Sequence, residues 1–182
     1  FKNKSHKIKL ISEGYGFHTL IITQDNTIHT YGDYKNNKLG QFKPAKNEDI
    51  FTDIYNIPFK PNIKQIQTGL EHTIILDYNG LCYGAGMNKE NQLTYFTNVN
   101  QLHTFEAMII NQSIIQIKCH FRTTFMINRD HDLIVSGLNF RNFMGTSMLP
   151  QLMYDPNDDE LDIHYLRYFK DNNIKIYSIS FG

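Results

Sequence analysis

Short apolar runs recur along the chain and alternate with turn residues. The runs at 19–23 and 73–76 are rich in Ile and are typical of short strands buried on both faces. Each is followed by a pair that tolerates positive φ, as a tight hairpin requires: Asp25-Asn26 and Asn79-Gly80. The next stretch, 27–31, alternates polar and apolar residues like a half-buried strand. The pattern therefore predicts an antiparallel meander of short strands.

The meander repeats with a period of roughly 50 residues. A glycine lies 14 residues after His18, His72 and Thr123, at Gly32, Gly86 and Gly137. An apolar anchor follows seven residues after each glycine, at Leu39, Leu93 and Met144. These spacings divide the chain into repeats at approximately 7–62, 63–113 and 114–173, with a fourth, truncated copy at 174–182.

The length of the period indicates how such units bury their cores. Three or four short strands cannot cover their own faces, but units stacked around an axis cover one another and leave short, protected sheet edges. A period near 50 is typical of a propeller blade rather than of a leucine-rich or ankyrin unit. We therefore predict an all-β fold, a β-propeller built of four-stranded blades.

The second copy carries a specific motif. Its residues fit the pattern V-x-x-I-x-x-G-x-x-H-S-x-x-L, a D-G turn and W-G-x-N-x-x-G-Q-L-G at Ile63, Ile66, Gly69, His72, Leu76, Asn79, Gly80, Gly86, Asn88, Gln92 and Leu93. This pattern resembles the regulator-of-chromosome-condensation repeat. The usual Trp before the glycine is replaced by Tyr31, Ala85 and Ser136, and the third copy reads His120-Phe-Arg-Thr123. The chain thus resembles a divergent member of that family.

The resemblance implies a propeller of seven blades in full, within the range of blade numbers known for this architecture. The chain covers only about half of such a ring, and three and a half repeats should not close one. We expect the remaining blades elsewhere in a longer protein, because the chain opens at Phe1 without a Met or a signal-peptide pattern. A partner covering the open edges is the alternative.

The repeated histidines and glycines favour structural roles. His18 and His72 are predicted to bond a ring nitrogen to a neighbouring backbone group, because repeat-related side chains lie one blade apart and cannot converge on a metal. Gly32, Gly86 and Gly137 are expected to permit close backbone approach or unusual φ at a strand end. No glycine-rich phosphate loop follows them.

Two insertions interrupt the repeats. Residues 42–62 are expected to hold an outer strand at 54–59. Residues 146–173 contain an acidic stretch, Asp155 to Glu160, that lacks the glycine and glutamate of a calcium loop. This second insertion is either a solvated acidic turn leading into a strand or helix, or a partner-binding protrusion. In the latter case the candidate contact residues are Asp158, Asp159, Tyr165, Arg167 and Tyr168.

Composition narrows the classes of partner and compartment. Lys plus Arg and Asp plus Glu balance at 18 each, which disfavours nucleic acid or chromatin. Apolar runs of four or five residues fall short of the roughly 20 that span a bilayer, so no membrane is expected. Cys82 and Cys119 form no CxxC pair, are expected to be small buried hydrophobes on strands, and suggest a reducing, intracellular compartment. Cytoplasm and nucleus stay equally open.

No catalytic Ser-His-Asp or Cys-His grouping can be assembled at these motifs, and no cofactor, metal or small molecule is expected. The sequence favours a non-catalytic protein-protein interaction scaffold that is part of a larger assembly. One alternative, implied by the family resemblance, is a guanine nucleotide exchange factor for a small GTPase. A second alternative is a regulatory propeller fused to an enzyme such as a ubiquitin ligase or kinase.

Overall fold

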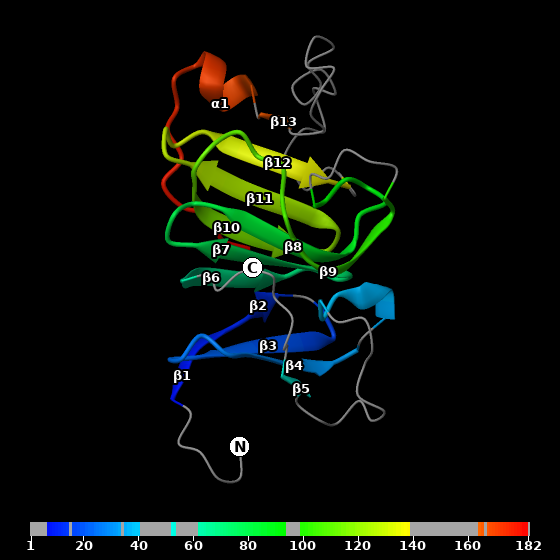
Figure 1. The fold of residues 1–182 in the computed structure, drawn as a ribbon. Helices are drawn as coiled ribbons and strands as arrows, with labels where there is room; N and C mark the ends of the chain where they lie inside the picture. Colours follow the sequence, from blue (N-terminus) through cyan, green and yellow to red (C-terminus); the bar gives the residue numbers. More distant parts are fainter. Residues whose placement is uncertain are drawn as a thin grey trace.

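The computed structural model describes residues 7–14, 16–33, 35–40, 52–53, 62–93, 99–138, 164–165 and 167–181. Three β-sheets follow one another along the chain and stack in a row (Figure 1). The only helical elements among the described residues are the 3-10 turn η1 (Lys35–Asn37) and the short helix α1 (Arg167–Asp171). The predicted all-β architecture of partial propeller type is confirmed.

Each sheet contains an antiparallel meander of short strands. The first sheet orders β1 (Ile8–Ile11), β3 (His18–Thr23), β4 (Ile28–Gly32) and β5 (Thr52–Asp53). The second orders β2 (Glu13–Gly14), β6 (Ile63–Thr68), β7 (His72–Asp77), β8 (Cys82–Met87) and β9 (Gln101–Ala107). The third orders β10 (Ile114–His120), β11 (Thr123–Asn128), β12 (Leu133–Gly137) and β13 (His164–Tyr165).

The second sheet departs from the expected four strands. The short strand β2 leaves the first repeat and pairs in parallel with β6, with Glu13 opposite Gln67 and Gly14 opposite Thr68. It therefore adds a fifth strand and ties the first repeat to the second through backbone bonds. The outer strand expected at 54–59 falls outside the described residues. The last strand of the first sheet, β5, pairs with β4 through Thr52 and Asp53.

Polar side chains fix the hairpin turns. Asp77 accepts hydrogen bonds from the amides of Asn79 and Leu81, both at 2.9 Å, while Gly80 adopts a φ of +88°. In the third sheet Asn128 does the same for the amide of Asp132 at 2.8 Å. A short polar side chain that bonds its own turn stabilises the tight reversal that joins the two central strands.

The core lies between the sheets. All six residues of β7 and all six of β11 are buried. β7 lies between the first and third sheets, whereas β11 packs on the second sheet through Met126 and lies in a cluster with Phe169 and Ile179 through Phe125. One cluster joins the first and second sheets and includes Leu20, Ile22, Ile28, Ile63 and Ile75; a second joins the second and third and includes Ile74, Leu76, Leu93, Ile114 and Ile117. Cys82 and Cys119 are buried in this second cluster, as predicted, and burial raises the pKa of the Cys119 thiol to about 12.

The burial of β6 and of its repeat equivalent β1 depends on whether an adjacent sheet covers them. Ile63 and Ile66 in β6 are 0% and 3% exposed, since the first sheet covers them. The equivalent residues of β1, which no sheet of the described residues covers, are Ile8 and Ile11, exposed at 51% and 54%. The same residue types at the same register thus change from core to surface with the presence of one neighbour.

A glutamine joins the second and third sheets. The side-chain amide of Gln65 donates to the carbonyl of Ile117 at 2.8 Å and accepts from its N–H at 2.9 Å. Lys64 adds a bond from Nζ to the carbonyl of Ile115 at 2.7 Å. Side chains of β6 therefore satisfy backbone groups of β10 that face away from β11.

We expect Gln65→Ala to lower the free energy of unfolding by about 1–3 kcal/mol, because it leaves both backbone groups of Ile117 without their partner. Urea unfolding followed by circular dichroism measures the change. Gln24→Ala, at an exposed turn position, is the control and should cost less than about 0.5 kcal/mol. Equal stability of the two variants would contradict the bridging role.

Candidate binding surfaces

The stacked sheets have two ends with different chemistry. At one end each middle strand begins opposite a glycine, in the pairs His18 with Gly32, His72 with Gly86 and Thr123 with Gly137. We call this the histidine end; it includes residues 16–18, 32–33, 35–40, 69–72, 86–93, 121–123 and 137–138. The opposite, hairpin end holds the turns at 24–27, 78–81 and 129–132. In Figure 1 the turns of the hairpin end lie along the left side of the molecule.

The three glycines occupy one backbone geometry. Their φ angles are +102°, +106° and +102°, and a Cβ at any of them would collide with the carbonyl oxygen of the residue before the paired His or Thr. That carbonyl accepts a hydrogen bond from the amide after the glycine, at 2.7 Å for Asp33 to Phe17, 2.8 Å for Met87 to Glu71 and 3.1 Å for Leu138 to Arg122. The glycines therefore allow the backbone to close each loop on itself.

A relay of hydrogen bonds crosses each junction between sheets. His18 Nε2 lies 2.8 Å from Thr73 Oγ1, and that hydroxyl donates to the carbonyl of Lys38 at 2.6 Å. His72 repeats the arrangement one sheet later with Thr124, whose hydroxyl donates to the carbonyl of Gln92. Because each hydroxyl has only one hydrogen to donate, the histidine donates from Nε2. The ring partner is thus a threonine hydroxyl rather than the backbone group expected from the sequence, and the backbone is reached one step further on.

The other ring nitrogen of each histidine is buried without a hydrogen-bond partner among the described residues. Gly16 and Gly69 lie against these rings, and a Cβ at either position would collide with the imidazole. Burial lowers the pKa of both His18 and His72 to about 3, with the charge of Lys38 contributing at His18. Both rings are therefore neutral near pH 7, which suits a fixed structural donor.

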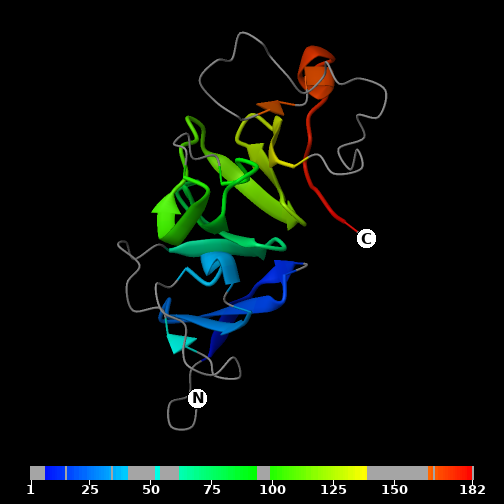
Figure 2. The ribbon, with the colours of Figure 1, turned by 90° about the vertical axis from the view of Figure 1, so that its right-hand side faces the viewer.

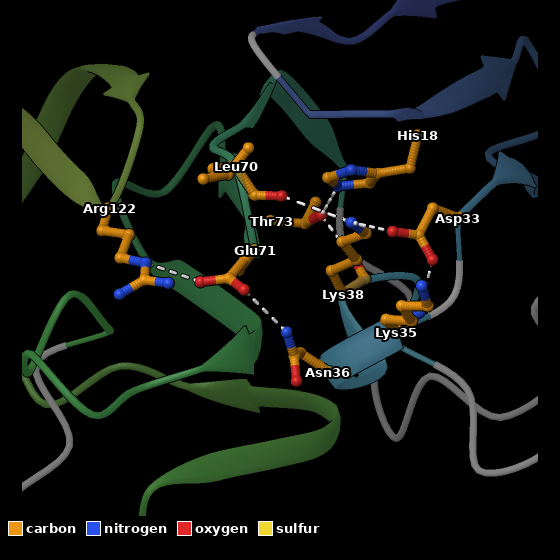
Figure 3. Close-up of polar contacts among 9 residues, drawn as sticks. All are labelled: His18, Asp33, Lys35, Asn36, Lys38, Leu70, Glu71, Thr73 and Arg122. Carbon is orange, nitrogen blue, oxygen red and sulfur yellow. Dashed lines mark hydrogen bonds and ion pairs between the residues drawn. The ribbon is translucent and has the colours of Figure 1, made fainter.

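A buried lysine occupies the first junction. Lys38, only 2% exposed, places Nζ 2.8 Å from the carboxylate of Asp33 and 3.3 Å from the carbonyl of Leu70 in the second sheet (Figure 3). Burial raises the pKa of Asp33, but hydrogen bonds from Lys38 and from the amide of Lys35 outweigh it and lower the pKa overall. The paired carboxylate offsets the cost of burying an ammonium group.

Further ionic contacts join all three sheets at the histidine end. Glu71, from the second sheet, accepts a hydrogen bond from Asn36 at 2.9 Å and pairs with Arg122 of the third sheet at 2.6 Å (Figure 3). Arg122 also approaches Glu90 at 3.5 Å. Phe17, at the repeat position of Glu71 and Arg122, is instead 76% exposed. This end thus presents one exposed aromatic residue beside loops that are tied to one another.

The candidate partner-binding residues of the second insertion are only partly described. Asp158 and Asp159 lie outside the described residues, as does the anchor Met144. Tyr165 is in β13, opposite Ile134, and Arg167 and Tyr168 begin α1. Figure 2 shows α1 beyond the outer edge of the third sheet, followed by an extended segment that runs back along that sheet. The structure therefore places these three residues at the outer edge of the third sheet.

Sequence reasoning missed the threonines of the relays, although a signal was present. A threonine follows the His or Thr position in every copy, at Thr19, Thr73 and Thr124. The ionic contacts gave no such signal, because equivalent positions hold Phe17, Glu71 and Arg122. Within the described part of the chain no cluster of three His, Cys, Asp or Glu side chains could hold a metal ion. Over the same residues, no helix has the length and apolar character needed to cross a bilayer.

Comparisons with known proteins show what the repeat and the fold are similar to. The sequence model of the Regulator of chromosome condensation (RCC1) repeat matches residues 63–92. The Ultraviolet-B receptor UVR8 of Arabidopsis thaliana is 25% identical over 146 residues, covering 76% of this chain and 31% of the receptor.

Solved structures show the same architecture. Human WBSCR16 superposes with a TM-score of 0.62 at 18% identity, over 73% of this chain and 34% of that one. Prp20p of Saccharomyces cerevisiae, described with its binding properties to Gsp1p and histones, gives 0.61 at 18% identity, over 74% and 31%. A structure of Kap60 bound to yeast RCC1 (Prp20) gives 0.63 at 16% identity, over 88% and 37%. The chain spans about a third of the length of each of these proteins.

Proposed function

We propose that this chain, a divergent member of the regulator of chromosome condensation repeat family, is part of a non-catalytic scaffold that holds partner proteins within a larger assembly. The observation that carries the proposal is the locking of consecutive sheets at the histidine end. Relays and ion pairs fix loops from three sheets relative to one another. Loops held in place before binding lose little entropy when a partner docks.

Phe17 is the proposed contact at this end. Its ring is 76% exposed, and the adjacent His18 and Gly32 hold its backbone in place through the closed loop. Aromatic side chains on rigid backbone are the residues that most often dominate protein interfaces. The outer edge of the third sheet, with Tyr165, Arg167 and Tyr168, is a second proposed contact region, together with Asp158 and Asp159 from the sequence.

Likeness to relatives favours protein partners generally. Prp20p was described with binding to Gsp1p and histones, and the yeast protein also binds Kap60. Formal net charge is zero for this chain, so we do not propose a chromatin partner. The likeness to Prp20p keeps one alternative, exchange of guanine nucleotide on a small GTPase, in which inserted loops would weaken nucleotide binding without side-chain chemistry.

The test is affinity purification of the full-length protein at native abundance, with quantitative mass spectrometry of bound proteins. We expect Phe17→Ser to lower recovery of at least one stable partner about fivefold or more, since a hot-spot aromatic residue is worth over 1 kcal/mol. Tyr177→Ser is the matched control, because Tyr177 is 73% exposed but lies toward the other end of the third sheet.

The outcomes separate the candidates. Recovery of a defined complex that weakens with Phe17→Ser and not with Tyr177→Ser supports the scaffold and its contact at the histidine end. If recovery of the partner falls only with Tyr165→Ser or Arg167→Ser, the contact lies at the outer edge of the third sheet. Recovery of a nucleotide-free small GTPase, with faster release of labelled nucleotide in vitro, would replace the scaffold with the exchange factor.

A further inference from the structure

Exposed apolar side chains gather around one turn of the hairpin end. Tyr78, Leu81 and Ile109 are 59%, 54% and 41% exposed. The amide of Met108 donates to the carbonyl of Cys82 at 2.9 Å. Leu81 and Ile109 are the chain neighbours of these two bonded residues. The amide of Tyr78 is likewise bonded to the carbonyl of Asn62 at 3.0 Å. We call these three residues, with Lys9, the turn patch.

The backbone beneath the turn patch is fixed. Asp77, 3% exposed, accepts bonds from the amides of Asn79 and Leu81, and the amide of Ile114 bonds the carbonyl of Gly80 at 3.0 Å. Exposed apolar side chains on such a backbone do not collapse onto one another, and they remain available at little entropic cost to a partner.

Among the described residues, no carboxylate pairs with Lys9, the cation of the turn patch. Lys9 Nζ bonds the side-chain oxygens of Asn26 at 3.1 Å and Asn62 at 3.3 Å, and lies 5.7 Å from the centre of the Tyr78 ring. Both oxygens are neutral, so they position the ammonium group without cancelling its charge. Asp77, at the start of the turn that holds Tyr78, directs its carboxylate to turn amides instead.

The cation of the turn patch differs in its partners from two cations of the histidine end. At the histidine end the charges of Lys38 and Arg122 are already met by carboxylates. At the turn patch Lys9 lies beside the Tyr78 ring and pairs with no carboxylate of the described residues. Charge complementarity selects an anionic group there, and the apolar residues select a hydrophobic side chain next to it.

We propose that the turn patch is a second docking surface, which binds an acidic and hydrophobic segment of a partner protein. One carboxylate of that segment lies at Lys9, and an apolar side chain packs against Tyr78, Leu81 and Ile109. The proposal rests on the scaffold function but uses a different face from Phe17. A nucleic acid is the poorer occupant, because a single positioned lysine with aliphatic neighbours neutralises few phosphates.

A peptide-display library panned against the immobilised full-length protein tests this surface. We expect enrichment of peptides with Asp or Glu next to Leu, Ile or Phe. Binding of the selected peptide should weaken fivefold or more with Lys9→Gln and with Leu81→Ser, while Phe17→Ser, a matched loss of exposed apolar surface at the other end, leaves it unchanged. Higher salt should weaken binding to the wild type more than to Lys9→Gln.

Several results would overturn the turn patch. They are enrichment of peptides without acidic residues, binding that Lys9→Gln and Leu81→Ser leave intact, and binding of a single-stranded oligonucleotide probe with no peptide enriched. If peptides bind but only Phe17→Ser weakens them, the turn patch fails and the scaffold stands. If no peptide is enriched and the native purification recovers no partner, both fail.

Discussion

Lowering the pH from 7 to 5 is expected to remove about 2 kcal/mol from the free energy of unfolding for each of His18 and His72. Burial lowers the pKa of both rings to about 3 in the folded protein, against 6.5 for an exposed histidine. Between these values the unfolded chain binds protons that the folded chain does not. Stability from the two histidines is therefore complete above pH 6.5 and declines as the pH falls toward 3.

The geometry gives the reason for the low pKa. A protonated ring would carry a second N–H on Nδ1, which faces Gly16 or Gly69 and has no acceptor among the described residues. At the first junction the buried ammonium of Lys38 repels the added charge as well. The size of the effect at pH 5 depends little on the folded pKa, provided that it stays well below 5.

Urea unfolding at pH 7.5, 6.5, 5.5 and 4.8 measures this loss. The double variant His18→Gln, His72→Gln keeps a side-chain N–H for each threonine and removes both titrations, so its stability should vary much less across the range. His103→Gln, which removes an exposed histidine on β9, should keep the wild-type profile. A double variant as acid-sensitive as the wild type would mean that other groups cause the decline.

Replacing Gly86 by alanine is expected to cost about 3 kcal/mol or more, enough to unfold a marginally stable domain. The φ of +106° is unfavourable for any residue with a Cβ, and the added methyl group would meet the carbonyl oxygen of Glu71, the Cα of His72 and the Cα of Lys38. All three neighbours are backbone atoms, so no side-chain rotation relieves the collision.

Thermal and urea unfolding of Gly86→Ala measure this cost. If the variant does not accumulate in soluble form, its refolding yield from urea beside the wild type supplies the comparison. Asn26→Gly is the control, because Asn26 has a φ of +61° at an exposed turn where glycine fits at least as well. That variant should stay within about 0.5 kcal/mol of the wild type. A cost below about 1 kcal/mol for Gly86→Ala would show that the loop relaxes around the methyl group.

The parts of this fold that sequence reasoning predicted are those that recur at fixed spacing. Gly32, Gly86 and Gly137 each close the same loop, so each copy needs the same residue at the same position. The contacts of Glu71 with Asn36 and Arg122 could not be predicted, because they combine one residue from each of three copies. Their equivalents in other copies differ, so no periodic signal marks them.

The third copy shows how a lost motif can mislead. The sequence places Thr123 where a histidine is expected and His120 where a glycine is expected. In the structure the ring of His120 stacks on Phe181 with centroids 4.9 Å apart, and Phe121 beside it takes a φ of +48°. The third copy thus still places an imidazole against the next segment of the chain. This imidazole comes from a position three residues before Thr123, and it contacts an aromatic ring rather than a hydroxyl.

The bonds between sheets also set an order in which the chain can acquire structure during synthesis. His18 with Thr73 spans 55 residues, His72 with Thr124 spans 52, and Gln65 with Ile117 spans 52. Each junction can therefore form as soon as the next repeat has left the ribosome, without waiting for any later part of the protein. Loop closure at each step involves about one repeat of chain and stays equally costly however long the protein becomes.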